Sequence, residues 1–153
     1  MRTLTVVCLL LIAADTPADK DEFKPSEDEQ ALLDRTNAER KAAGVAALKS
    51  SPKLFAAARG HATNMAKQDK LAHDLDGKTF GDRIKATGYE YAAAAENIAK
   101  GQPTPKEAVE SWMGSPPHKA NLLNGEYTEV GLAVAKNDAG ERYWVQVFAA
   151  PPK

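Results

Sequence analysis

The sequence predicts an α+β domain in which helices come first and an antiparallel β-hairpin comes last. Apolar residues recur at helical spacing through most of residues 26–123, whereas residues 130–148 alternate with a period of two around a central turn. No strand–helix–strand rhythm, which would indicate a parallel sheet, occurs. With 153 residues and an apolar fraction of 43%, the chain has the size of one domain with a substantial core.

Two long helices are predicted in the first half of the chain. Ser26 and Glu29 form a capping-box pattern, so the first helix is expected to begin there and to end at Gly44. The second opens at Ser51-Pro52, a cap residue followed by proline in the first turn. One stripe of this helix carries Leu54, Ala58, His61 and Met65. His61 is therefore expected to be a packed, hydrogen-bonded core histidine.

Shorter elements follow. We expect a short helix within Gly77–Gly88 and then an extended segment over residues 89–98. Further helices should open at Thr104-Pro105 and at Ser115-Pro116, each with proline in the first turn. Two alternating strands joined by a turn over residues 137–140 complete the hairpin.

Composition excludes several classes of function. The net charge is −1 and the charges of both signs are interspersed, so nucleic acid is not an expected partner. No apolar run has the length of a bilayer-spanning helix. The sequence contains no G-x-S-x-G nucleophile elbow, no H-E-x-x-H zinc motif, no P-loop and no glycine-rich dinucleotide fingerprint.

The N-terminus has the pattern of a secretory signal peptide over residues 1–18. Arg2 provides a positive charge, and an apolar stretch over residues 4–14 is followed by small residues. Cleavage is expected after Ala18, with Ala14 as the alternative, so residues 19–25 form a linker and residues 26–153 the domain. A buried first strand or helix is less favoured, because the apolar run ends abruptly in polar sequence. The protein is therefore expected to be secreted or periplasmic, with membrane contact only through the signal peptide.

The single cysteine, Cys8, lies within this signal. A lipid anchor at Cys8 is not favoured, because Val7 precedes it where lipid-anchor signals have a small residue. Removal of the signal leaves a mature chain without cysteine, which must rely on its core rather than on disulfides.

Three polar residues stand in unusual surroundings. His73 lies in a polar loop after the second helix, Glu96 follows four alanines, and His118 follows two prolines that fix its backbone. Taken singly, each has an ordinary alternative: a solvated loop histidine, an exposed residue of an edge strand and a surface histidine. Together, two imidazoles and a carboxylate suit proton transfer or a three-ligand site for a divalent metal such as zinc, with an open water position.

Five segments of the chain occur in the order and spacing of a known family. They are Asn37–Arg40, Leu71–His73, Ala95–Ala99, Ser111–His118 and Tyr143–Phe148. The chain resembles the SCP domain of the CAP superfamily (cysteine-rich secretory proteins, antigen 5, pathogenesis-related 1), above all its disulfide-free bacterial branch. The resemblance covers nearly all of residues 29–151.

This resemblance implies an α-β-α sandwich, with a small antiparallel sheet between helical layers, and an extracellular setting. It also implies a cleft with two histidines and two glutamates, through whose histidines several members bind zinc or another divalent ion. His73 and His118 match the histidines and Glu96 matches one glutamate. The second glutamate does not carry over, because Ser115 occupies its position. Glu110 is near in sequence, but its offset from the tryptophan places it in another direction on a helix.

Three functions remain open. The first is a secreted binding module whose cleft holds a small molecule, a lipid or a glycan, with or without a metal. The second is a metal-dependent hydrolase acting on peptide or cell-wall substrates, and the third is a structural interaction domain. We favour the binding module, because the sequence identifies no general base beyond the three expected ligands and a fold rarely fixes a function.

Overall fold

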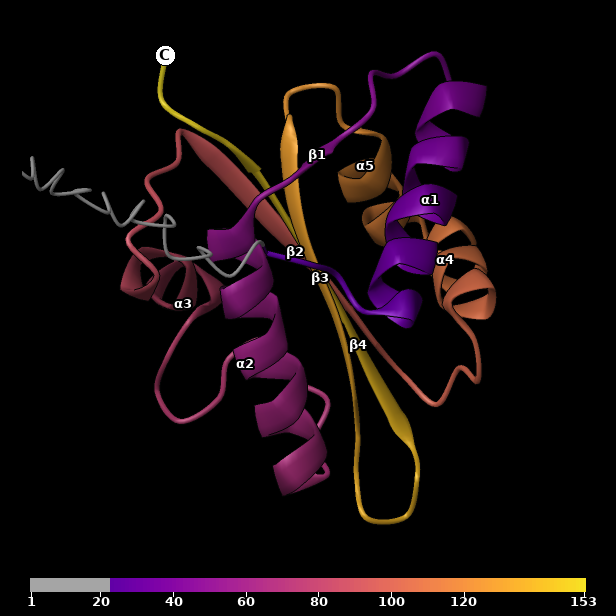
Figure 1. The fold of residues 1–153 in the computed structure, drawn as a ribbon, viewed down its shortest axis with the longest axis vertical. Helices are drawn as coiled ribbons and strands as arrows, with labels where there is room; N and C mark the ends of the chain where they lie inside the picture. The colour runs from indigo at the N-terminus through magenta and orange to yellow at the C-terminus, as the bar shows by residue number, and fades with distance from the viewer. Residues whose placement is uncertain (1–22) are drawn as a thin grey trace, which may run out of the picture.

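The computed structural model describes residues 23–153, where a four-stranded sheet lies between two layers of helices (Figure 1). The elements in chain order are α1 (Glu27–Ala42), β1 (Lys49–Ser50), α2 (Pro52–Gln68), α3 (Phe80–Ala86), β2 (Ala93–Lys100), α4 (Pro105–Met113), α5 (Pro116–Leu123), β3 (Glu129–Lys136) and β4 (Arg142–Ala150). Helices α2 and α3 cover one face, and α1, α4 and α5 cover the other. The expected α+β class and α-β-α sandwich are confirmed. The expected signal peptide, most of the linker and Cys8 lie outside the described residues.

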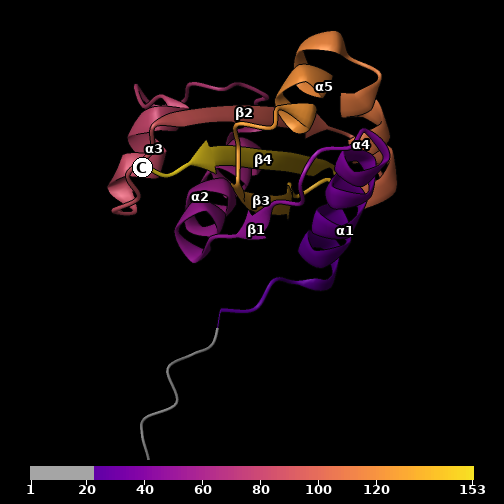
Figure 2. The same ribbon diagram turned by 90° about the horizontal axis from the view of Figure 1, so that it is seen from above.

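The strands are arranged in the order β1-β3-β4-β2. β4 lies between β3 and β2 and pairs antiparallel with both. The β2–β4 register runs from Ala93 opposite Ala150 to Lys100 opposite Tyr143. β2 therefore lies at one edge of the sheet (Figure 2). β1 pairs parallel with β3, so the sheet is mixed at its other edge rather than wholly antiparallel. The sequence did not reveal β1, because two residues are too short to show a period.

The helix boundaries follow from local chemistry. The hydroxyl of Ser26 accepts a hydrogen bond from the Glu29 N–H, and the Glu29 carboxylate accepts one from the Ser26 N–H, as the capping box predicts. A second capping box joins Thr79 and Asp82 at the start of α3. Gly44, just beyond α1, has a φ of +73°, a conformation that favours glycine.

Each face of β4 packs against a different helical layer. Tyr143, Val145 and Val147 lie in the core cluster beneath α2, whereas Trp144 and Phe148 lie in the cluster beneath α1, α4 and α5. Both clusters are closely packed, because every one of these five residues is at most 1% exposed.

Gly131 on β3 allows α2 to approach the sheet directly. A Cβ atom added there would lie only 2.0 Å from the backbone carbonyl carbon of Leu54, so helix backbone and strand backbone are in contact at this point.

Among residues 23–153, none of the helices combines the length and apolarity needed to cross a bilayer.

Candidate ligand cleft at the edge of the sheet

Glu96 on β2 is the centre of a buried charged cluster. Its side chain is only 1% exposed. Oε1 accepts a hydrogen bond from Nδ1 of His73 at 2.9 Å, and Oε2 accepts one from Nη2 of Arg83 at 2.7 Å. A buried carboxylate is costly unless it is paired and hydrogen-bonded, and here both oxygens are satisfied by cationic partners.

Arg83 joins three segments around this carboxylate. While Nη2 binds Glu96, Nη1 donates to the carbonyl oxygens of His73 at 2.8 Å and of Lys78 at 3.3 Å. The α2–α3 loop is thereby attached to α3 and to β2. Sequence reasoning missed Arg83, because the short helix carries two basic residues and has no periodicity that singles out either of them.

His73 lies where the sequence predicts, next to Glu96. The hydrogen bond from its ring to Glu96 raises the pKa of His73 above its usual value, and the nearby negative charge adds to the effect. The side chain is still 49% exposed, so the ring remains accessible from the cleft.

His61 also lies beside this cluster. The ring is buried, and its Nε2–H donates to the Ala72 carbonyl at 2.9 Å, as expected of a packed histidine. The same nitrogen is 3.8 Å from Oε1 of Glu96. Burial lowers the pKa of His61, which keeps the ring neutral. Its apolar stripe identified the packing but not the proximity to Glu96.

His118 lies on α5, which covers the face of the sheet opposite α2 and α3. Its backbone carbonyl, at the start of α5, accepts a hydrogen bond from Nδ2 of Asn97 at 3.0 Å. Partial burial lowers the pKa of the His118 ring, and the positive charge of His73 lowers it further. Across residues 23–153, no group of three or more His, Cys, Asp or Glu side chains is arranged to hold a metal ion. The metal site of His73, Glu96 and His118 stays a prediction.

A cleft of about 490 Å³ lies over this cluster. It is lined by His73, Asp74, Phe80, Ala94, Ala95, Glu96, Asn121 and Tyr127. One wall comes from the α2–α3 loop and the start of α3, and the other from α5 and the connection to β3. Four of the eight lining residues are polar or charged, so the cleft combines apolar surface with polar groups that can orient a ligand.

A buried polar network holds the second wall in place. Oδ1 of Asn97 accepts a hydrogen bond from Asn121 at 3.0 Å, and Nδ2 of Asn97 donates to Oε1 of Gln146 at 3.1 Å. This series of hydrogen bonds ends on α1, where the hydroxyl of Thr36 accepts a hydrogen bond from Nε2 of Gln146 at 2.8 Å. Asn97, Gln146 and Thr36 are all fully buried, so this network ties α5 rigidly to the sheet and to α1.

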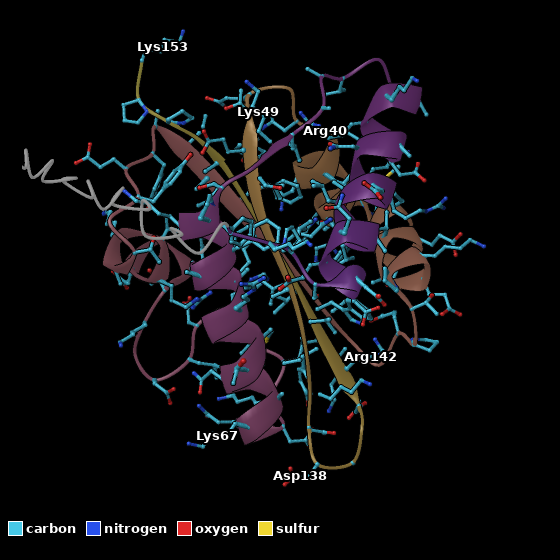
Figure 3. The ribbon with its side chains drawn as sticks, viewed as in Figure 1. Arg40, Lys49, Lys67, Asp138, Arg142 and Lys153 are labelled. Atoms are coloured by element: carbon cyan, nitrogen blue, oxygen red, sulfur yellow. The ribbon has the colours of Figure 1, made fainter. Side chains whose placement is uncertain are left out.

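Arg40 fixes the α5–β3 connection (Figure 3). Its buried guanidinium donates to the carbonyl oxygens of Ala46, Leu122, Asn124 and Tyr127 at 2.8–3.1 Å. Because one guanidinium donates to several backbone carbonyl groups at once, it determines the path of the segment that carries Tyr127 into the cleft.

Ser115 and Glu110, the two residues near the position of the second family glutamate, have other surroundings. Ser115 is the N-cap residue of α5 and makes no capping bond with its side chain. Glu110 forms ion pairs with Arg35 at 3.8 Å and with Lys106 at 3.5 Å. Like His118, Glu110 does not line the cleft over Glu96.

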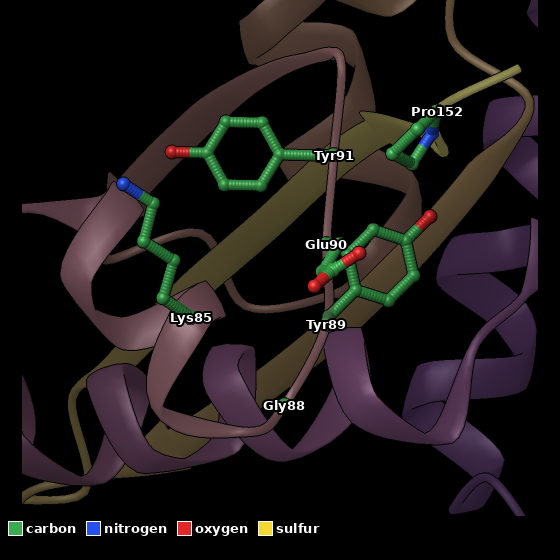
Figure 4. A pocket seen from close by; sticks show the side chains of 6 residues that line it. All are labelled: Lys85, Gly88, Tyr89, Glu90, Tyr91 and Pro152. Carbon is green, nitrogen blue, oxygen red and sulfur yellow. The ribbon is translucent and has the colours of Figure 1, made fainter.

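A second hollow, of about 570 Å³, contains none of the predicted site residues (Figure 4). It is lined by Lys85, Gly88, Tyr89, Glu90, Tyr91 and Pro152. Although it is larger, it lacks a buried charged group such as Glu96. We therefore assign the candidate site to the cleft over Glu96.

Known proteins share this architecture. A family model described as CAP, the cysteine-rich secretory protein family, matches residues 33–148. YkwD of Bacillus subtilis is 37% identical over 123 residues, which are 78% of this chain and 46% of YkwD. The membrane protein YlbC of the same organism is 32% identical, over 78% of this chain and 34% of its own length. The chain thus spans less than half the length of these relatives.

Solved structures agree in fold. An outer surface protein from Borrelia burgdorferi superposes with a TM-score of 0.78 at 23% identity, over 85% of this chain and 97% of its own. An extracellular protein containing an SCP domain from Bacillus anthracis gives a TM-score of 0.72 at 28% identity, over 80% of this chain and 40% of its own. On the family match and the B. subtilis relatives, the chain belongs to the CAP family of cysteine-rich secretory proteins.

Proposed function

We propose that this chain is an exported binding module that holds a small ligand, a lipid or a glycan, in the cleft over Glu96. The observation that carries the proposal is a buried carboxylate held by His73 and Arg83 beneath a cleft of about 490 Å³. Clefts of this size with mainly apolar walls and a few oriented polar groups are the usual form of ligand sites, which span about 300–1,000 Å³.

Export is part of the proposal. It is supported by the signal-like residues 1–18 and by similar proteins described as extracellular or as outer surface proteins. A binding module that operates outside the cell without disulfides needs a stable core, and both faces of the sheet are closely packed.

The geometry favours binding over hydrolysis. A general base must lie within hydrogen-bond reach of the water that it activates, and a carboxylate that serves to position other side chains is oriented by them instead. Both oxygens of Glu96 already accept hydrogen bonds, and one of them pairs with the permanently charged guanidinium of Arg83. Glu96 is therefore placed to hold His73 and Arg83 in position beneath the cleft.

A divalent metal such as zinc is a second candidate, favoured by the hydrogen bond between Nδ1 of His73 and Glu96. Carboxylates commonly orient metal-binding histidines in this way through the other ring nitrogen. In such a site His73 and His118 would bind the metal and Glu96 would orient His73. The Arg83–Glu96 pair argues against Glu96 as a direct ligand. A bound metal would supply a Lewis acid that attracts oxygen atoms of a ligand.

Isothermal titration calorimetry tests the proposal. Wild-type protein, Glu96→Gln and the matched control Glu110→Gln are titrated with three probes: N-acetylglucosamine trimer, laurate and zinc ions. We expect one organic probe to bind wild type and Glu110→Gln equally and Glu96→Gln about tenfold more weakly, a change of about 1.4 kcal/mol.

Equal affinities in all three proteins, or no binding by either organic probe, would overturn the small-ligand proposal. Binding of zinc alone, weakened by His73→Ala and by His118→Ala, would select the metal candidate instead. Release of trimer fragments by the wild type but not by Glu96→Gln, detected by mass spectrometry, would show a hydrolase.

A further inference from the structure

We propose that the ligand of the cleft is an extended peptide, which adds a strand to the free edge of β2 at Ala94 and Glu96. This inference rests on one part of the proposed function, that the chain is a binding module whose ligand lies over Glu96, and it replaces the lipid or glycan by a peptide. It follows from the direction of backbone groups along β2, which the side-chain arrangement of the cleft does not reveal.

β2 has a strand on one side only, because it lies at the end of the order β1-β3-β4-β2. In an antiparallel pair, alternate residues direct their N–H and C=O groups toward the partner strand and away from it. The N–H of Gly101 donates to the carbonyl of Arg142, the residue opposite it when the β2–β4 register is continued by one position. Counting back in steps of two, residues 99, 97, 95 and 93 face β4, whereas residues 94, 96, 98 and 100 face outward.

An independent contact confirms this alternation. The carbonyl oxygen of Ile98 accepts a hydrogen bond from the indole Nε1 of Trp112 at 3.0 Å, so it points away from β4. Trp112 therefore occupies the outer edge at Ile98 and ends the part of the edge that a new strand can use.

The outer edge carries no hydrogen bond from the described residues at the next two positions, of which Ala94 is partly exposed and Glu96 is 5% exposed. Within residues 23–153, no side chain and no backbone group forms a hydrogen bond with the N–H or C=O of Ala94 or Glu96 on that side. Two donors and two acceptors, two residues apart, are the pattern to which an extended peptide pairs.

The cleft opens onto this part of the edge. Ala94, Ala95 and Glu96 are three of its lining residues, so the strand itself forms the floor. An added strand would lie about 4.8 Å from β2 and direct alternate side chains toward opposite walls. One wall presents His73 and Phe80, and the other presents Asn121 and Tyr127.

Backbone pairing explains why a peptide suits this floor better than a lipid or a glycan. An apolar lipid chain would leave the outward amide and carbonyl groups of Ala94 and Glu96 without partners, at a cost in free energy. A peptide supplies both donors and acceptors at the matching spacing, so recognition is expected to tolerate many sequences.

Amide hydrogen exchange measured by NMR on the whole protein tests the inference. The probe is a capped hexapeptide of alternating Thr and Val, and its control carries N-methyl groups on two consecutive central residues, which blocks both of its edges. We expect the probe to slow exchange of the Ala94 and Glu96 amides about tenfold, and the methylated control to leave them unchanged.

A protein variant provides a second readout. Ala94→Pro removes the outward N–H without removing a hydrogen bond to β4, and edge strands tolerate proline at such a position. It should fold and bind the hexapeptide at least tenfold more weakly than the matched control Ala94→Val, which keeps the N–H.

The possible results separate the two proposals. If laurate or N-acetylglucosamine trimer binds over Glu96 but the hexapeptide protects neither amide, the inference is wrong and the small-ligand function stands. Equal protection by the methylated peptide, or equal binding by both Ala94 variants, would also overturn the inference. If the hexapeptide protects both amides and neither organic probe binds, the inference stands and the lipid or glycan ligand is wrong. If no probe binds at the cleft, both proposals fall.

Discussion

Glu96 and Asn97 are neighbours on β2, and they hold opposite walls of the cleft. Because successive strand residues point to opposite faces, Glu96 lies on the α2–α3 side and Asn97 on the α5 side. Glu96 binds His73 and Arg83, whereas Asn97 binds Asn121 and the carbonyl of His118. One strand therefore sets the positions of both histidine-bearing segments relative to each other.

Glu96→Gln should lower the pKa of His73. The carboxylate is the largest cause of its raised pKa, and an amide of the same shape removes the charge while it keeps the fold. The titration of the His73 ring by NMR, in protein treated with a chelator, measures the shift. An unchanged pKa would show that the charge of Glu96 does not act on this ring.

The same pair makes stability depend on pH. A histidine whose pKa is raised in the folded state contributes stability that is fully present below its unfolded pKa of about 6.5 and is lost as pH rises through its folded pKa. The difference in unfolding free energy between wild type and His73→Ala should therefore shrink as pH rises through that range. A difference that grows with pH would contradict this sign.

Asn97→Ala should destabilise the domain by about 3 kcal/mol, or roughly 10 °C in Tm, because it leaves several buried polar groups without partners. Thermal unfolding measures the loss. Asn64→Ala is the matched control, since Asn64 makes only exposed side-chain hydrogen bonds, with Asp76 and Gln68, and it should cost less than about 1 kcal/mol. Equal losses in the two variants would show that the buried network adds nothing.

Arg40→Met should also be strongly destabilising, by at least about 3 kcal/mol, because four carbonyl groups lose their donor and the bonds to Leu122 and Tyr127 are buried. Urea unfolding checks the magnitude. Arg35→Met removes only ion pairs of 3.8 and 4.0 Å at a partly exposed position and should cost less than about 1 kcal/mol. If Arg40→Met were as stable as Arg35→Met, Arg40 would not fix the α5–β3 connection.

Gly131→Ala should destabilise the fold by more than about 3 kcal/mol, because its Cβ would collide with the backbone of Leu54 and α2 would have to move. Gly60→Ala is the informative contrast. It lies within α2 with nothing within 4 Å of a Cβ, so it should stabilise by about 0.5–1 kcal/mol. The two free energies of unfolding should thus change in opposite directions, and a tolerated Gly131→Ala would disprove the close approach.

The sequence predicted those features that depend on local or periodic signals. The Ser26–Glu29 cap located α1, and the alternation around residues 137–140 located the β3–β4 hairpin. The proximity of His73 to Glu96 came from the family resemblance, since these residues are far apart in the chain.

The missed features all depend on tertiary contacts. Arg83 carries no local mark that distinguishes it from Lys85, and its role follows only from the position of its guanidinium between two segments. The link from Asn97 through Gln146 to Thr36 joins three elements, which no periodicity connects. β1 has a strand partner only because Lys49 and Ser50 run beside β3.

The most direct test of the account is an NMR map of the backbone amides that shift when the best of the tested probes is added. The account predicts that the largest shifts fall on His73, Glu96 and Asn121, and that Glu96→Gln needs about tenfold more probe to reach them. Largest shifts on Lys85 and Tyr91, in the second hollow, would contradict the assignment of the ligand cleft to Glu96.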